Sequence, residues 1–319
     1  MSKQLVHLTK ISDLSKEIIE RILRTAADMK KNESKYYKAM EHKTLLMFFE
    51  KPSLRTRVSL EAGMNLLGGH AIYYDVSTGP LGKKENFHDT AICSSRFADI
   101  ISARLNKKED LWELAKYAEV PVINLLDNWA HPCQMLADLL TITEKKHKKF
   151  NEMTFTYVGD VHNNVTYDLM RACAVMGMNM KVSGPNKPGF EIEQPIWDEV
   201  NELCKKSGAK ITYHESAEEA CTDVDIIYCD SWMSYGIPKD LEEKRKEIFM
   251  PYQIDGKKLA LAHKDCIFMN CLPAARGAEQ TAEVIDGPQS VVFDQAENRM
   301  WAQNALLVYL AHGESALLK

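Results

Sequence analysis

The chain has 319 residues, of which 45% are hydrophobic and 27% charged, and its formal net charge is −5 at pH 7 with histidine neutral. This composition is typical of a globular protein and excludes a mainly disordered or collagen-like chain. Acidic residues offset the scattered lysines and arginines, so the sequence gives no sign of nucleic-acid binding. It contains no run of 18 apolar residues and predicts no membrane span.

The N-terminal segment and the cysteines predict a cytoplasmic protein. The segment MSKQLVHLTKISD has neither the apolar core of a signal peptide nor the Arg-rich character of a transit peptide. None of the eight cysteines belongs to a CxxC pair, which argues against zinc ribbons and thioredoxin chemistry. We therefore expect reduced and mostly buried thiols.

Two successive series of strand-like and helix-like segments run along the chain. The first series predicts helices at 14–29, with Ser12 or Asp13 as its cap, and at 55–67, 87–97, 111–118 and about 131–146, and strands at 44–49, 71–74, 100–103 and 121–124. The second predicts strands at 155–158, 179–182, 210–213, 226–228 and 267–269, and helices at 164–176, 196–207 and 296–311. Such alternation predicts an α/β protein with two doubly wound domains, each a parallel sheet flanked by helices.

We place the domain boundary near residue 148, in the charged and polar segment KKHKKFNE. The first domain is then 1–148, with a C-terminal helix of 295–319 that packs back onto it, and the second domain is 149–294. Open parallel sheets bind ligands at the carboxyl ends of their strands. We therefore expect an active site in the cleft between the domains, built from the segments that follow the strands.

Two segments of the first domain carry the groups of an anion site. FEKPSLRTRVSLE opens a helix with Ser53, Arg55 and Thr56, and the N–H groups and dipole of a helix N-terminus attract phosphate. Arg104 directly follows the strand at 100–103 and would reach the same edge. A capping serine with solvated arginines is the alternative interpretation. The segment lacks GxxxxGK[ST] and is not a P-loop.

Two further segments offer hydrogen-bonding side chains. His131 and Gln134 of HPCQ lie three residues apart on one helix face and can hold a carbonyl or amide group. Asn163 and Asn164 of VGDVHNNV open a helix after a strand and suit a carboxylate or an amine. Capping by the histidine or by the asparagines is the alternative. The second segment lacks GxGxxG, which weakens a dinucleotide-binding interpretation.

The remaining segments add an acid, a thiol and a third arginine. Asp230 and Ser234 of CDSWMSYG can bind a cationic amine. Cys271 of FMNCLPAARG lies on a turn, because the proline that follows Leu272 disfavours helix there. Arg299 of AENR lies near the start of the last helix. Together the segments suit a phosphate, a carbonyl and an amino-acid-like partner, and they contain no metal-ligand spacing and no Ser-His-Asp order.

In this order the motifs SxRTR, HPxQ, GDxxNN, DxWxSxG, CLP and AENR resemble the aspartate/ornithine carbamoyltransferase family over about residues 5–312. The resemblance implies transfer of a carbamoyl group from carbamoyl phosphate to an amine, by positioning and electrostatics and without a cofactor or a metal. At Leu54 the family often has Thr, and a backbone N–H can still serve there. The implied carbamoyl phosphate site consists of Ser53, Leu54, Arg55, Thr56, Arg104, His131, Gln134 and Arg299.

The 230s loop and CLP resemble the ornithine branch, which implies L-ornithine as acceptor and citrulline as product. Tyr235, where that branch has Met, and Asn270, where it usually has His, depart from the pattern, so putrescine or another ornithine-like amine stays open. Putrescine enzymes resemble YGLYE in this loop, and Ser-Tyr-Gly here favours ornithine. The implied catalytic groups are Arg104, His131 and Cys271. The implied ornithine site consists of Asn164, Asp230, Ser234, Tyr235, Cys271 and Leu272.

Two other classes of protein fit less well. A nucleotide-binding oxidoreductase needs a Gly-rich turn that GDVHNN does not supply. An inactive relative that only binds is disfavoured because every phosphate-side group is present.

The resemblance also implies an assembly. The family forms trimers with sites at subunit interfaces, so we expect a homotrimer, and higher assemblies stay open. In the polar loop at 77–85, Lys83 or Lys84 could reach a neighbour's phosphate or be solvated. The sequence does not tell whether the reaction serves arginine synthesis or arginine degradation.

Overall fold

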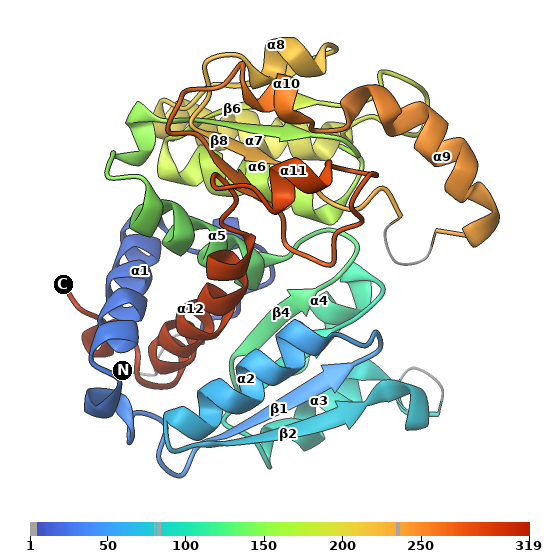
Figure 1. The fold of residues 1–319 in the computed structure, drawn as a ribbon. Helices are drawn as coiled ribbons and strands as arrows, with labels where there is room; N and C mark the ends of the chain where they lie inside the picture. The colour runs from blue at the N-terminus through green and yellow to red at the C-terminus, as the bar shows by residue number, and fades with distance from the viewer. Residues whose placement is uncertain (1–4, 80, 82–83, 234–236) are drawn as a thin grey trace. The chain divides into compact units, whose positions relative to one another are not determined.

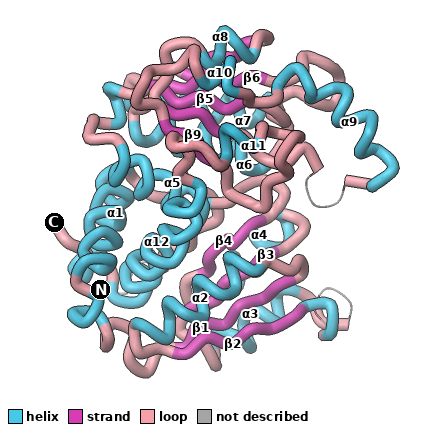
Figure 2. The backbone as a smooth tube through the Cα atoms, viewed as in Figure 1, coloured by secondary structure: helices cyan, strands magenta, loops and turns pink. Residues whose placement is uncertain are grey.

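The structure is a computed structural model that describes residues 5–79, 81, 84–233 and 237–319. It divides into two compact units, Met1–Leu140 with Glu297–Lys319, and Thr141–Ala296. Each unit is built around one parallel sheet flanked by helices, which confirms the predicted α/β class (Figures 1 and 2). None of the described helices is long and apolar enough to cross a membrane.

The sheet of the first unit has four parallel strands in the order β2-β1-β3-β4. Of its central strands, β3 is buried throughout and the largely apolar β1 is buried at four of its six residues, as expected of strands covered on both faces. β1 begins and ends as predicted, β2 and β3 extend one residue beyond their predicted bounds, and β4 begins one residue and ends two residues later than predicted. The strands are β1 (Thr44–Phe49), β2 (His70–Asp75), β3 (Ile100–Arg104) and β4 (Val122–Leu126).

Helices cover both faces of this sheet. α2 (Leu54–Leu66) connects β1 to β2 on one face. The chain then returns to the other side of β1, so α3 (Phe87–Ser95) and α4 (Lys108–Tyr117) cover the opposite face, because parallel crossovers are right-handed (Figure 1). The strand order therefore reverses between β1 and β3.

Three longer helices complete the first unit or continue from it: α1 (Lys16–Lys31), α5 (Pro132–Lys145) and α12 (Val292–His312). α1 is capped by Ser15, whose Oγ accepts a hydrogen bond from the Ile18 N–H at 3.3 Å. The predicted caps Ser12 and Asp13 are wrong, because Ile11–Asp13 forms a separate 3₁₀ turn. Lys30 of α1 donates to the Asn298 side chain of α12 at 2.9 Å.

The sheet of the second unit has five parallel strands in the order β7-β6-β5-β8-β9. The chain runs outward from β5 through β6 to β7 and then crosses to β8 on the other side of β5. α6 and α7 therefore lie on one face, and α8 and α10 on the other (Figure 2). The strands are β5 (Thr154–Val158), β6 (Asn179–Ser183), β7 (Ile211–His214), β8 (Ile226–Tyr228) and β9 (Ile267–Met269).

The helices of the second unit include four that the sequence did not predict. α6 (Asn164–Met176) begins and ends as predicted, and α7 (Gln194–Ser207) begins two residues earlier. The four missed helices are too short to show a helical period. They are α8 (Ala217–Cys221), α9 (Glu242–Phe249), α10 (Gly256–Leu259) and α11 (Ala282–Ile285). Short 3₁₀ helices also occur at Ile11–Asp13, Glu33–Tyr36, Val76–Thr78, Phe150–Glu152, Lys239–Leu241, Met250–Tyr252 and Glu314–Ala316.

One glycine fixes how closely α12 approaches α2 within the first unit. Gly63 lies in the interior of α2, where glycine costs about 1 kcal/mol of helix stability relative to alanine. A Cβ atom at this position would lie 2.1 Å from Oδ1 and 3.0 Å from Cγ of Asn304, a fully buried residue of α12. The glycine is therefore required by packing rather than by its conformation.

We predict that Gly63→Ala destabilises the protein by about 1–3 kcal/mol, because the added methyl group overlaps Asn304. Asn304→Ala removes the overlapping amide group, so the double variant should recover most of the loss. Chemical denaturation of the parent, both single variants and the double variant measures these free energies of unfolding. A Gly63→Ala variant as stable as the parent would contradict the tight helix contact.

Candidate functional site

The predicted anion-binding residues lie where the strand order of the first sheet reverses. Ser53 follows β1, and Arg104 is the last residue of the adjacent β3, where it pairs in register with Phe49. The chain leaves β1 toward one side and β3 toward the other. Open parallel sheets bind ligands at this reversal, at the carboxyl ends of the strands.

The N-terminus of α2 combines a cap with an uncompensated dipole. Ser53 is the N-cap, and its Oγ accepts a hydrogen bond from the Thr56 N–H at 3.4 Å, so the capping interpretation is confirmed. The first turn of α2 contains no acidic residue that would neutralise the positive end of the dipole. The Leu54 side chain is apolar and 75% exposed, so only the backbone N–H of this residue can contribute to an anion site.

Arg299 joins three helices of the first unit in one buried cluster. Its Nη1 donates to Oε1 of Gln134 on α5 at 2.8 Å, and its Nη2 donates to Oγ1 of Thr56 on α2 at 3.1 Å. All three side chains are at most 2% exposed. Gln134 in turn donates from Nε2 to Oδ1 of Asp138 at 2.8 Å. Our sequence analysis missed Asp138, although its i, i+4 spacing from Gln134 on a predicted helix was a usable signal.

His131 lies between β4 and α5, and its ring is kept neutral. Its carbonyl accepts hydrogen bonds from the N–H groups of Gln134 and Met135, so its backbone begins α5. Burial lowers the pKa of His131 well below its ordinary value, and the charges of Arg299, Arg104 and Arg55 lower the pKa further. A neutral imidazole can donate one hydrogen bond to a carbonyl oxygen.

The first unit thus brings together the predicted phosphate-side and carbonyl-side residues. Arg55, Arg104 and Arg299 all act on the charge of His131, and Arg299 contacts Thr56 and Gln134 directly. Three guanidinium groups around a neutral ring form a strongly positive site. Such a site attracts a multiply charged anion and can polarise a carbonyl group.

The second unit has a reversal of its own, between β5 and β8. Asn163 and Asn164 follow β5, Asp230 follows β8, and Cys271 follows the neighbouring β9. The Cys271 thiol donates a hydrogen bond from Sγ to Oδ1 of Asp230 at 3.2 Å. An acid and a thiol at this edge provide acceptors for an amine, in contrast to the positive site of the first unit.

Asn163 is a structural cap rather than a ligand-binding group. Its Oδ1 accepts from the Thr166 N–H at 2.8 Å, and its Nδ2 donates to the Asp160 carbonyl at 2.7 Å and to the Tyr157 hydroxyl at 3.0 Å. The capping alternative is confirmed for this residue. The next residue, Asn164, opens α6 beside it.

A buried ion pair that the sequence did not predict connects the segments that follow β5 and β8. Arg245 of α9 donates to the Asp160 carboxylate and, from Nε, to the Trp232 carbonyl at 2.7 Å. Burial raises the pKa of Asp160 to about 6, and the Arg245 charge opposes this rise. Within its run of charged residues, EEKRKE, Arg245 had no local signal that separated it from a solvated lysine or arginine.

Several predictions concern residues elsewhere. Ser234, Tyr235 and Lys83 lie outside the described residues, and Lys84 is exposed. Of the seven cysteines expected to be mostly buried, five are buried, Cys204 is half-buried and Cys93 is exposed. Within the described parts of the chain, no group of three His, Cys, Asp or Glu side chains is arranged to hold a metal ion.

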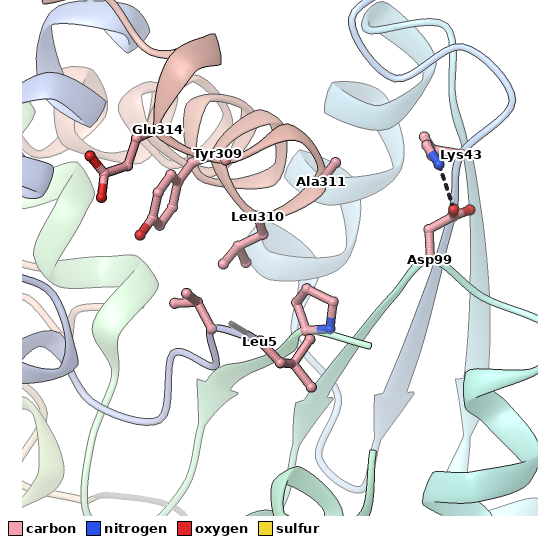
Figure 3. Close-up of a pocket in the computed structure, with 10 residues that line it drawn as sticks. Leu5, Lys43, Asp99, Tyr309, Leu310, Ala311 and Glu314 are labelled. Carbon is pink, nitrogen blue, oxygen red and sulfur yellow. Dashed lines mark hydrogen bonds and ion pairs between the residues drawn. The ribbon is translucent and has the colours of Figure 1, made fainter. Parts of the chain in front are cut away.

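A separate cavity of about 450 Å³ lies at the other edge of the first sheet (Figure 3). Lys43, Asp99 and Pro121 in its lining directly precede β1, β3 and β4, and the end of α12 closes its other side. The Lys43 ammonium and the Asp99 carboxylate form an ion pair at 2.8 Å. None of the predicted site residues lines this cavity, so it is distinct from the candidate site.

Comparison with known proteins identifies the class of enzyme. Residues 6–144 match the family model "Aspartate/ornithine carbamoyltransferase, carbamoyl-P binding domain", and residues 151–310 match "Aspartate/ornithine carbamoyltransferase, Asp/Orn binding domain". The chain belongs to the aspartate/ornithine carbamoyltransferase family.

Similar proteins are ornithine carbamoyltransferases. The one from Methanococcus aeolicus is 43% identical, with 96% of this chain and 99% of the relative covered. The crystal structure of ornithine transcarbamoylase from Giardia lamblia has a TM-score of 0.89 at 44% identity, covering 97% of this chain and 99% of that one. Ornithine carbamoyltransferase from Pyrococcus furiosus has a TM-score of 0.91 at 41% identity, covering 98% and 99%.

The neutral state of His131 predicts a pH-dependent loss of stability. The folded chain resists protonation of this ring, whereas the unfolded chain protonates it near pH 6.5, so stability falls as the pH drops below that value. Between pH 7.5 and pH 5.0 the parent should lose about 2 kcal/mol more unfolding free energy than His131→Gln. Urea denaturation at both pH values measures the difference. The exposed His147, changed to Gln, serves as control, and equal losses in the parent and His131→Gln would refute the neutral ring.

Proposed function

We propose that this chain is an ornithine carbamoyltransferase. It transfers the carbamoyl group of carbamoyl phosphate to the δ-amine of L-ornithine and releases citrulline and phosphate. The observation that supports it best is the Arg299 cluster, in which groups suited to a phosphate and to a carbonyl meet in one buried network. We assign carbamoyl phosphate to residues 1–148 with 295–319, and the amine to residues 149–294.

In the proposed mechanism the phosphate group lies against the start of α2. Ser53, the Leu54 backbone N–H, Arg55 and Thr56 bind its oxygens together with Arg104. Charge accumulates on the phosphate as the C–O bond breaks, and preorganised arginines stabilise that charge without further reorganisation. The buried position of Arg104 and Thr56 strengthens these interactions because water competes less.

The carbamoyl group is held by His131, Gln134 and Arg299. The neutral His131 ring and Arg299 donate to the carbonyl oxygen, which becomes negative as the amine attacks, and each such donor contributes on the order of 3 kcal/mol. Asp138 fixes the Gln134 amide, so that its orientation is set before substrate binds. Because the reaction moves the carbamoyl group directly from phosphate to amine, both units are needed for it.

Ornithine is held by Asn164, Asp230, Ser234, Tyr235, Cys271 and Leu272. Asp230 pairs with its α-amino group. The neutral δ-amine attacks the carbonyl carbon, the bond to phosphate breaks, and the proton that the amine gives up is taken up by the departing phosphate. The Cys271 thiol donates a hydrogen bond to Asp230, and its Sγ can also act as a weak acceptor toward the δ-amine.

We further propose a homotrimer in the cytoplasm. The cytoplasmic assignment is supported by eight cysteines that are all free thiols in the structure. Lys84, in the loop at 77–85 that would reach a neighbouring subunit, is exposed.

A matched pair of arginines on α2 tests the phosphate site. We predict that Arg55→Ala lowers kcat/KM for carbamoyl phosphate by about 100- to 1,000-fold, because a charge-stabilising group is lost. Arg57 lies two residues along the same helix but pairs with Glu61 at 3.0 Å, so Arg57→Ala should change the value by less than about 3-fold. Steady-state kinetics with saturating ornithine measures both, and equal effects of the two substitutions would refute the assignment.

A panel of amines tests the acceptor. We predict that ornithine gives a kcat/KM at least about 100-fold above putrescine, N-acetylornithine and aspartate, because a site built for an α-amino group rejects compounds without it. Phosphate release measured with each amine, and with none as the blank, gives the comparison. Faster turnover of putrescine or N-acetylornithine would identify a different carbamoyltransferase.

A further inference from the structure

The Cys271–Leu272 turn after β9 has a backbone conformation that needs support. Leu272 has a φ of 56°, in the left-handed region that residues with a branched side chain rarely adopt. Such a conformation costs about 1–3 kcal/mol and persists only where surrounding groups determine it. The same turn carries the Cys271 thiol and the Leu272 carbonyl, the two groups assigned to the δ-amine.

Asn270 supplies the local support for this turn. Its Oδ1 accepts a hydrogen bond from the Leu272 N–H at 2.7 Å, which closes the turn from within. Its own N–H donates to Oε1 of Gln295 at 3.0 Å. Its Nδ2 donates to Oε1 of Gln280 at 3.2 Å. Backbone and amide are thus both held, and the residue has no exposed surface.

Two glutamines anchor Asn270 to the rest of the second unit. Gln280, also fully buried, donates from Nε2 to the Ala275 carbonyl at 3.1 Å and accepts from the Cys229 thiol at 3.3 Å. Gln295 donates from Nε2 to the Tyr228 hydroxyl at 3.2 Å. The network therefore connects both ends of the 270–275 turn to β8, the strand that leads to Asp230.

We infer that Asn270 is a positioning residue for the amine acceptor, acting through the Cys271 thiol and the Leu272 carbonyl. One amide group supplies both the acceptor for the Leu272 N–H and the donor for Gln280, which an apolar side chain cannot do. Full burial keeps Asn270 itself from touching substrate. The inference rests on the proposed function, because it assumes that this turn faces the amine.

The test compares Asn270→Ala with Gln280→Leu and with Gln289→Ala as control. Gln289 also donates a half-buried amide to a backbone carbonyl of this unit, that of Cys266, but it lies between α11 and α12, outside the turn. For Asn270→Ala we expect kcat/KM for ornithine to fall by about 100-fold, as for a misplacement of about 1 Å. KM for carbamoyl phosphate should stay within about 3-fold, because its residues lie in the other unit.

Gln280→Leu retains the Asn270–Leu272 hydrogen bond, so it should lower kcat/KM for ornithine less than Asn270→Ala does. The fold-loss in the double variant should be smaller than the product of the two single losses. Thermal melting checks that each variant is folded, and Gln280→Leu carries the test if Asn270→Ala does not fold. Ornithine kinetics unchanged in the folded variants, or KM values raised equally for both substrates, would overturn the inference. If the parent prefers another amine in the panel, the proposed acceptor fails, and the same variants are then measured with that amine.

Discussion

The positive site of the first unit depends on the buried guanidinium of Arg299. Arginine presents its donors in a fixed fork, and here the fork reaches α5 through Gln134 and α2 through Thr56, so a single side chain from α12 sets the spacing of three helices. Arg55 and Arg104 act on the same His131 ring as Arg299, so a phosphate dianion bound there would offset the repulsion among the three guanidinium groups. Burial and the same repulsion lower the pKa of His131 and keep it neutral, because protonating it would add a fourth positive charge in a buried site.

The candidate amine site of the second unit is acidic, in contrast to the positive site of the first unit. Asp230 lies near Asp160, and each carboxylate disfavours the charge of the other. Arg245 offsets the charge of Asp160, and Asp230 accepts a hydrogen bond from the weakly polar thiol of Cys271. An ammonium group of a ligand would add an ion pair to this hydrogen bond, and an ion pair is the stronger interaction of a carboxylate. An amino acid with two amines fits this site better than one with a second carboxylate.

The elements predicted correctly from the sequence are those whose signals come from neighbouring residues. β1, β8, β9 and α6 were placed to the residue, because buried parallel strands are continuous apolar runs and α6 starts at an asparagine cap and ends at a glycine. Contacts between distant residues could not be predicted this way. Asn270 and Gln280 are ten residues apart in an irregular segment, and Arg245 is 85 residues from Asp160. Nothing in their neighbours distinguishes them from ordinary polar residues, so only the fold reveals the pairs.

A residue that caps a helix can also contribute to a ligand site, so the two interpretations of the sequence do not exclude each other. Ser53 caps α2 and Asn163 caps α6, and each lies at the reversal point of its sheet. A cap fixes the direction in which the first turn of the helix presents its N–H groups and side chains. Capping by Ser53 therefore determines where Arg55 and Thr56 lie, and capping by Asn163 determines where Asn164 lies. Asn163, which caps the helix and does not bind substrate, can in this way be as necessary to a site as a residue that does, which is also the role we assign to Asn270.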